Sequence, residues 1–227
     1  MTPTFTSQFD QSMRRYYDLL SREYDEWHHR EGKFADRPDN NQWHAEISQL
    51  CERVQPFGYG RLLEIAAGTG RWTQYLARHA KVVALDYAPL MLQQTQLRLH
   101  KQNMAAQCVR GDAYTLPFGA ASFDGCFFGF WLSHVPLVWL QAFLADVRRV
   151  VRRGGQVLVV DSAPKMPERQ PNVEYILERV LNDESRHDVL KIFHTPETLA
   201  ATLTPLGKVL DTWATGRFFS GAVVEVV

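Results

Sequence analysis

The stretch LLEIAAGTGRWT, residues 62–73, constrains the fold of this chain more than any other part of its sequence. Its first half is apolar, as in a buried strand, and a Gly-Thr-Gly turn then leads into a helical pattern that starts at Arg71. A glycine turn between a strand and a helix lets the backbone approach a nucleotide-like ligand closely, because glycine has no side chain. The stretch therefore predicts a βα unit with a ligand site at its turn.

Further apolar runs alternate with helical patterns after this unit. The runs cover residues 81–89, 106–113, 122–131 and 155–163. Such alternation predicts parallel strands with helices on both faces of the sheet. The tail, residues 208–227, predicts two strands joined near Gly216 as an antiparallel hairpin. The predicted fold is α/β, a Rossmann-like, doubly wound, seven-stranded sheet with a C-terminal antiparallel hairpin.

Residues 1–57 have no strand pattern. Apolar and aromatic residues from Phe9 to Trp27 recur at the spacing of one amphipathic helix, and a second helix is predicted from Asn40 to Val54. Three tyrosines, two tryptophans and three histidines make this section suitable as a lid over a ligand. A cover that only packs against one edge of the core is the alternative.

The strand–helix rhythm is interrupted again at residues 164–195, which we predict to be a substrate-facing insertion in a catalytic domain of residues 58–227. A helix is predicted at Val173–Leu181 within it. Thr195 followed by Pro196 predicts the start of the next helix. Before the insertion, a helical stripe over residues 140–151 is predicted to end in the basic turn and glycine at residues 152–154.

The charge balance and the cysteines exclude several classes of protein. The 227 residues carry 25 Lys plus Arg and 25 Asp plus Glu, so no overall positive charge attracts nucleic acid or an anionic membrane. No apolar run approaches membrane-spanning length, and the polar N-terminus lacks a signal-peptide core. The three cysteines fit neither a disulfide framework nor a zinc site. We expect a cytoplasmic monomer or homodimer without metal, nucleic-acid or membrane partners.

Acidic residues stand at three strand ends, namely Glu64, Asp86 and Asp112. A carboxylate at the binding edge of a parallel sheet can accept two hydroxyl hydrogen bonds at once. Capping of the following helix is the structural alternative for Asp86 and Asp112. An NAD site is disfavoured, because Thr73 occupies the place of the third glycine of a dinucleotide fingerprint.

Four motifs in this order resemble those of the class I S-adenosylmethionine-dependent methyltransferases. They are LLEIAAGTG, VVALDYAP, GDAYTLPF, and FDGCFFGFWLSHVP followed by RRGGQVLVVD. The resemblance covers about residues 61–227 and is greatest to the small-molecule branch, which includes ubiquinone and menaquinone biosynthetic enzymes and natural-product methyltransferases. It implies S-adenosylmethionine as the cofactor and methyl transfer to a small aromatic or heterocyclic metabolite.

The resemblance also implies which residues hold the cofactor. Asp86 is expected to accept both ribose hydroxyls, Tyr87 to pack against the adenine, and Asp112 to accept from the adenine amino group. The Ala113 amide is expected to reach a ring nitrogen. The remaining implied cofactor residues are Glu64, Ala66, Gly68 and Gly70 at the first turn, and Gly129 after the fourth strand.

For the methyl acceptor, we predict contacts with Tyr16, Tyr24 and Trp131 and a proton-handling role for His134. His134 follows the fourth strand, and an imidazole with an ordinary pKa near 6.5 accepts protons at neutral pH. Packing or capping is its structural alternative. The chain lacks the Pro-Pro-aromatic motif of amino-N methyltransferases, and Asp161 lacks the neighbouring acid of magnesium-dependent enzymes.

Two functions therefore stay open at this point. The first is methyl transfer by direct in-line displacement to an O, N or C atom. The second is binding of S-adenosylmethionine without methyl transfer, as in a cyclase or an assembly partner.

Overall fold

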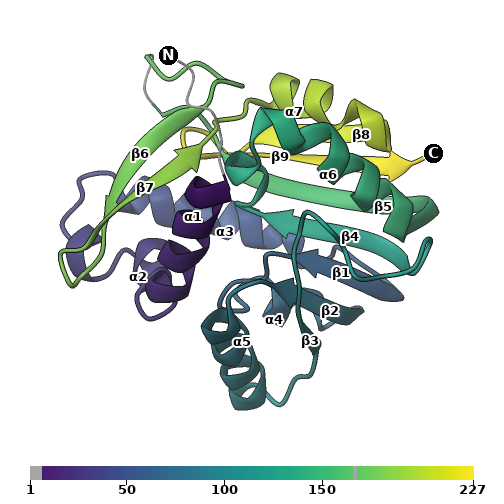
Figure 1. Ribbon diagram of the computed structural model, residues 1–227, viewed down its shortest axis with the longest axis horizontal. Coiled ribbons are helices and arrows are strands. Elements are labelled where there is room, and N and C mark those ends of the chain that lie inside the picture. The colour runs from purple at the N-terminus through teal and green to yellow at the C-terminus, as the bar shows by residue number, and fades with distance from the viewer. Residues whose placement is uncertain (1–6, 166–167) are drawn as a thin grey trace.

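A seven-stranded sheet in the order β3-β2-β1-β4-β5-β9-β8 forms the centre of the computed structural model (Figure 1). Its strands are β1 (Arg61–Ile65), β2 (Lys81–Asp86), β3 (Gln107–Arg110), β4 (Phe123–Gly129), β5 (Val151–Ser162), β8 (Gly207–Ala214) and β9 (Phe219–Val226). The first five strands are parallel, and β9 pairs antiparallel with β5 and β8. The predicted α/β fold and terminal hairpin are therefore confirmed.

The structure describes residues 7–165 and 168–227. Residues 1–6 of the predicted lid and residues 166–167 of the predicted insertion lie outside the described residues. Within the described part, no helix is long and apolar enough to cross a membrane.

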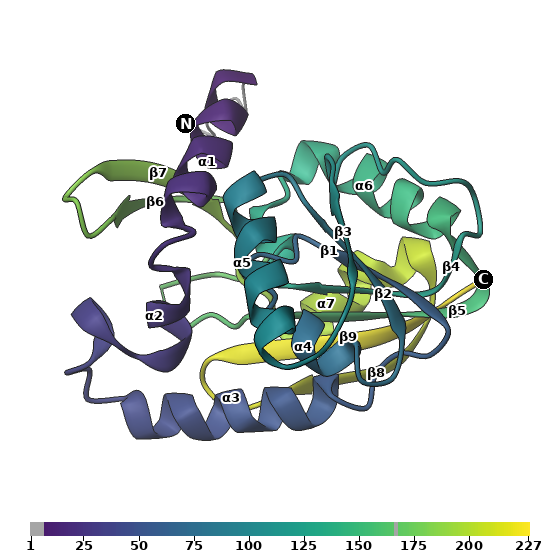
Figure 2. The ribbon, with the colours of Figure 1, turned by 90° about the horizontal axis from the view of Figure 1, so that it is seen from below.

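Helices cover both faces of the sheet (Figures 1 and 2). The α-helices are α1 (Ser7–Leu20), α2 (Tyr24–His29), α3 (Asn40–Val54), α4 (Thr73–Leu76), α5 (Pro89–Lys101), α6 (Leu137–Val150) and α7 (Pro196–Leu203). Short 3-10 helices are η1 (Gly32–Phe34), η2 (Leu132–His134) and η3 (Thr204–Leu206). In β4, Cys126 and Phe128 pack in the core under α6 and α7, whereas Phe127 packs with α3 and α4. Successive strand side chains point to opposite faces, so both faces are buried and the strands are apolar throughout.

The predicted helix at residues 173–181 is wrong. Residues Tyr175–Val180 form β6, which pairs antiparallel with β7 (Arg186–Lys191) in a separate two-stranded sheet. The turn between them is stabilised by Asp183, whose carboxylate accepts hydrogen bonds from the Ser185 amide and hydroxyl. Pairing with β7 through this turn outweighs the weak helical spacing of 173–181, because strand formation depends on the tertiary partner.

Two helix boundaries also differ from the prediction. The single amphipathic helix predicted from Phe9 to Trp27 is broken at residues 21–23 into α1 and α2. Helix α6 ends at Val150, and residues 152–154 belong to β5 instead of the helix end. Helix α3 has its predicted bounds, and the Thr195 side chain caps α7 as predicted by accepting the Thr198 N–H.

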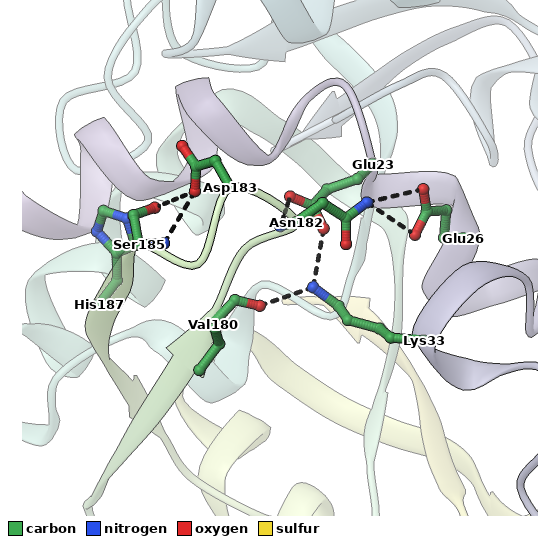
Figure 3. Close-up of polar contacts among 8 residues, drawn as sticks. All are labelled: Glu23, Glu26, Lys33, Val180, Asn182, Asp183, Ser185 and His187. Atoms are coloured by element: carbon green, nitrogen blue, oxygen red, sulfur yellow. Dashed lines mark hydrogen bonds and ion pairs between the residues drawn. The ribbon is translucent and has the colours of Figure 1, made fainter.

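The β6–β7 hairpin packs against the N-terminal helices, although the contacting residues Glu23 and Asn182 are 159 positions apart in the chain (Figure 3). Glu23 accepts the Asn182 N–H at 2.9 Å, and the Asn182 side-chain amide donates to Glu26. Lys33 donates both to Glu23, at 2.8 Å, and to the Val180 carbonyl, at 2.6 Å. Residues 7–57 and the hairpin therefore form one continuous cap beside the sheet, which we call the two-part cap.

Helix α3 is held to the sheet by the buried carboxylate of Glu46. It accepts the Arg217 and Phe218 amides at 2.9 and 2.8 Å and the Thr215 hydroxyl at 2.6 Å, all from the β8–β9 turn. At Gly216, where φ is +141°, an added Cβ would lie 2.9 Å from Glu46 Oε1. The turn must therefore carry glycine to approach this carboxylate.

We predict that Glu46→Ala lowers the free energy of unfolding by about 2–4 kcal/mol, because it leaves several buried donors without an acceptor. Urea unfolding followed by circular dichroism measures the change. Glu52→Ala, at an exposed position of the same helix, is the control and should change stability by less than about 0.5 kcal/mol. Equal effects of the two substitutions would refute a clamping role for Glu46.

Candidate active site

A cavity of about 410 Å³ lies at the carboxyl ends of the parallel strands, where the two-part cap faces the sheet. Its floor comes from the segments that follow β1 to β4, and its other walls come from α1, α2, the η1 region and the hairpin. The order in which the strands are added to the sheet reverses between the parallel neighbours β1 and β4, because β2 and β3 lie on the far side of β1 and β5 lies on the far side of β4. Such a topological switch point is where ligands bind in open α/β sheets.

The turn after β1 is held in an unusual backbone conformation. Ala66 has φ +54°, Gly68 φ +59° and Gly70 φ +76°. A left-handed alanine is strained, and strained residues in natural proteins cluster at functional sites. Ala66 and Gly68 line the cavity, whereas Gly70 does not. An added Cβ at Gly70 would lie 2.9 Å from the Thr95 backbone, so Gly70 allows the turn to pack on α5.

Asp86 joins the ends of β1 and β2. One of its carboxylate oxygens accepts the Gly68 N–H at 2.8 Å, and the other accepts the Ala88 N–H at 2.9 Å. A carboxylate has about four acceptor positions, so about two are left for a ligand. Burial raises the pKa of Asp86 to about 6, although the backbone N–H groups of Ala88 and Gly68 oppose this increase.

Glu64 does not line the cavity and lies behind the turn, 1% exposed. Neither of its carboxyl oxygens has a hydrogen-bond partner among the described residues, although Thr73 lies next to it. Burial raises the pKa of Glu64 to about 8, so the group is mostly protonated at neutral pH. The structure therefore places Glu64 as a support for the turn, without direct access to a ligand in the cavity.

Tyr87 and Asp112, the two side chains expected at an adenine ring, lie at one end of the cavity. Arg14 from α1 covers them, with its guanidinium 2.9 Å from Asp112 and 4.1 Å from the centre of the Tyr87 ring. Asp112 also accepts the Tyr114 N–H, and the neighbouring Ala113 lines the cavity. Sequence reasoning missed Arg14, because only the folded chain brings α1 across the ends of β2 and β3.

At the other end of the cavity, His134 contacts a tyrosine that sequence reasoning also missed. Its Nδ1 is 2.7 Å from the Leu190 carbonyl, which only accepts, so Nδ1 carries the proton. Its Nε2 is therefore the acceptor for the Tyr17 hydroxyl, at 2.9 Å. Burial, and next the charge of Lys191, lower the pKa of His134 to about 3. The ordinary pKa assumed from the sequence is therefore wrong, and His134 is neutral at physiological pH.

The other predicted site residues also line the cavity, namely Tyr16, Tyr24, Gly129 and Trp131. The Tyr24 ring faces the glycine turn, 3.8 Å from where a Cβ on Gly68 would lie. The indole N–H of Trp131 is buried without a partner among the described residues. Phe130, next to it, has φ +60° and lines the same wall, which makes it a second strained residue at the cavity.

A buried ion pair stands behind His134. The Lys191 ammonium donates to the Ser133 hydroxyl at 2.6 Å and to Asp161 at 3.4 Å, and Asp161 accepts the Ser133 and Ser162 amides. Both carboxylate oxygens of Asp161 therefore have donors within the protein. Among the described residues, no group of three His, Cys, Asp or Glu side chains is arranged to hold a metal ion.

We predict that Asp86→Ala weakens binding of S-adenosylhomocysteine by at least about tenfold, because hydrogen bonds from ribose hydroxyls to a carboxylate are lost. Calorimetric titration measures the affinity. Asp211→Ala, an exposed substitution on β8, is the control and should leave it unchanged. The hydroxyls favour the ionised carboxylate, so the affinity of the parent protein should also fall as the pH drops through about 6. An unchanged affinity in folded Asp86→Ala would refute the assignment.

Comparison with known proteins places the site in a family. Residues 62–155 match the family model described as "Methyltransferase domain". The chain is 38% identical over 125 residues to the malonyl-[acyl-carrier protein] O-methyltransferase of Erwinia pyrifoliae, which covers 51% of this chain and 44% of that protein. It is 36% identical over 123 residues to the ubiquinone/menaquinone biosynthesis C-methyltransferase UbiE of Rhizobium etli. This match covers 52% of this chain and 46% of UbiE. The matched region thus spans about half the length of these curated relatives.

A solved structure extends the likeness to the two-part cap. The complex of DhpI with SAM and HEP superposes with a TM-score of 0.75 and 28% identity, covering 97% of this chain and 99% of that one. The cavity also fits S-adenosylmethionine, the cofactor of this family, because Asp86 keeps open acceptor positions beside a turn that admits close approach. The resemblance to the class I S-adenosylmethionine-dependent methyltransferases is therefore confirmed.

Proposed function

We propose that the protein transfers the methyl group of S-adenosylmethionine to an O, N or C atom of a small molecule bound under the two-part cap. The observation that carries this proposal is the position of Asp86 and the glycine turn at the floor of an enclosed, aromatic-lined cavity. The relatives named above act on different atoms, one being an O-methyltransferase and the other a C-methyltransferase. The proposal therefore leaves the accepting atom open.

Each part of the cavity has a task in this reaction. Asp86 and the turn at Gly68 hold the ribose and methionine parts of the cofactor, which supplies an activated methyl group on a sulfonium. Tyr16, Tyr24 and Trp131 enclose the acceptor and exclude water, and their faces favour an aromatic or heterocyclic ring. Alignment of the acceptor with the methyl group can supply several kcal/mol of the rate enhancement.

We infer that His134 acts through Tyr17 if the acceptor releases a proton. Nε2 of His134 is occupied by the Tyr17 hydroxyl, and burial raises the pKa of Tyr17 well above 10. Tyr17 would take the proton from the acceptor while giving its own to His134. The buried Asp161 favours the resulting imidazolium, since its charge opposes the lowering of the His134 pKa.

Release of S-adenosylhomocysteine in the presence of candidate acceptors is the test of methyl transfer. In this assay, Tyr17→Phe and His134→Asn should each lower turnover by about a hundredfold, the size typical of acid–base catalysis. The double variant should lose little more, because the two groups act as a unit. Binding of S-adenosylhomocysteine should be unchanged in all three. Turnover within a few-fold of the parent would leave positioning as the only role of the pair.

The same assay separates transfer from binding alone. A protein that binds S-adenosylmethionine tightly yet forms no S-adenosylhomocysteine with any acceptor, while converting one to a product without an added methyl group, would refute the proposed function.

We further propose that the two-part cap is a lid that closes over the bound ligands, as expected for a reaction that gains from excluding water. Hydrogen exchange of the amides in α1, α2 and the β6–β7 hairpin should slow when S-adenosylhomocysteine is added. Amides of α7, on the far side of the sheet, serve as the internal control. Equal exchange of the cap with and without the ligand would indicate a fixed cover.

A further inference from the structure

The cavity lining carries more positive than negative side chains, although the chain as a whole is electrically balanced. Its acids are Glu23, Asp86 and Asp112. Its cations are Arg14, Lys33, Arg37, Lys165, Arg169, Arg179 and Lys191. A local excess of one sign in a concave, low-dielectric site attracts ligands of the opposite sign.

The ion pairs in the cavity do not neutralise this excess of positive charge. Arg14 pairs with Asp112, Lys33 with Glu23, and Lys191 with Asp161 behind the wall. Among the described residues, no carboxylate forms an ion pair with the other four cations, which are Arg37, Lys165, Arg169 and Arg179. These four, which we call the unpaired cations, therefore supply the net positive charge.

The unpaired cations lie away from the acids of the cofactor site. Asp86 ends β2 and Asp112 follows β3, on one side of the β1–β4 switch point, whereas Lys165 follows β5 on the other side. Arg179 lies on β6 of the cap, and its charge acts on Tyr17, His134 and Lys191. The positive region is therefore next to the end of the cavity where the methyl acceptor is expected.

Lys165 is the innermost of the unpaired cations. Its ammonium stands 4.8 Å from the centre of the Trp43 ring and 4.7 Å from that of Phe218, and it makes no hydrogen bond to a described residue. Burial lowers the pKa of Lys165 to about 7, and the charges of Arg30, Lys191 and Arg37 add to this, while Asp39 opposes it. Desolvating an ammonium without an anionic partner is costly, and an incoming anion would offset that cost.

We propose that the methyl acceptor is an anionic small molecule, whose carboxylate or phosphate-type group binds Lys165 inside the cavity. Arg37, Arg169 and Arg179 then attract it to the mouth of the cavity. This inference rests on the proposed function, because it gives the chemical class of the substrate for that reaction. A compact oxyanion fits, since the cations surround one enclosed cavity and the chain has no overall positive charge for a polyanion.

The test is calorimetric titration of the whole protein, saturated with S-adenosylhomocysteine, at constant ionic strength. The two probes are inorganic phosphate and malonate, and their relative affinities distinguish a phosphate-type from a carboxylate site. Lys165→Met should weaken the binding of the preferred probe by at least about tenfold, as expected for loss of a charge-assisted contact. Lys165→Arg should retain most of the affinity.

Proton uptake provides a second readout that a purely structural lysine would not give. Malonate stays ionised near pH 7.5 and its binding favours the ammonium form of Lys165, so a titration with malonate at this pH should take up protons, seen as a dependence of the measured heat on the ionisation enthalpy of the buffer. The uptake should disappear in Lys165→Met. Lys208→Met, an exposed substitution on β8, is the matched control and should change neither affinity nor uptake.

The outcomes separate this inference from the function on which it rests. Failure of S-adenosylhomocysteine to bind would remove the proposed function itself. Normal binding of S-adenosylhomocysteine, with anion affinity that is absent or equal in the parent and Lys165→Met proteins, would overturn only the anionic substrate. Loss of S-adenosylhomocysteine binding in Lys165→Met would also overturn it, since the lysine would then serve the cofactor or the fold.

Discussion

The proposed cofactor site depends on the contact between the Asp86 carboxylate and the Gly68 amide. It joins the ends of β1 and β2 and fixes the glycine turn in the left-handed conformation that also strains Ala66. Gly70 completes this arrangement from behind, because it lets the turn approach Thr95 on α5 without a side chain between them. The floor of the cavity is therefore built before a ligand arrives, and little order has to be gained on binding.

Burial under the two-part cap determines the chemistry of the cavity. It lowers the pKa of His134 to about 3 and raises those of Tyr16 and Asp86 to about 12 and 6. His134 and Tyr16 are therefore neutral at physiological pH, whereas Asp86 is mostly ionised. Of the unpaired cations, Arg37 and Arg179 lie on the two-part cap and Lys165 follows β5. This separation of charges would help methyl transfer from a sulfonium to an anionic acceptor. The positive sulfonium would lie on the side of Asp86, and the anionic acceptor would lie on the side of the unpaired cations.

The sequence predicted the sheet well and the cap poorly. The apolar runs of the five parallel strands are buried on both faces by local helices, so their pattern in the sequence is strong. Strand β6 is largely exposed and, among the described residues, pairs with β7 alone. Its alternation of apolar and polar residues is weak, and the sequence therefore predicts a helix at Val173–Leu181 instead. The hairpin is attached to the N-terminal helices by contacts of Asn182 and Val180 with Glu23 and Lys33, which lie far away in the chain.

The sequence by itself determined the βα units, the glycine turn, the acids at Asp86 and Asp112, and helix α3, because each is encoded by residues close together in the chain. Tertiary structure alone decided which groups face one another across the cavity. Tyr17 contacts His134 although they are 117 positions apart in the sequence, and Arg14 contacts Asp112 although they are 98 positions apart. It also decided the charge states, since the pKa of a side chain depends on its burial and on neighbours that folding brings together from distant segments.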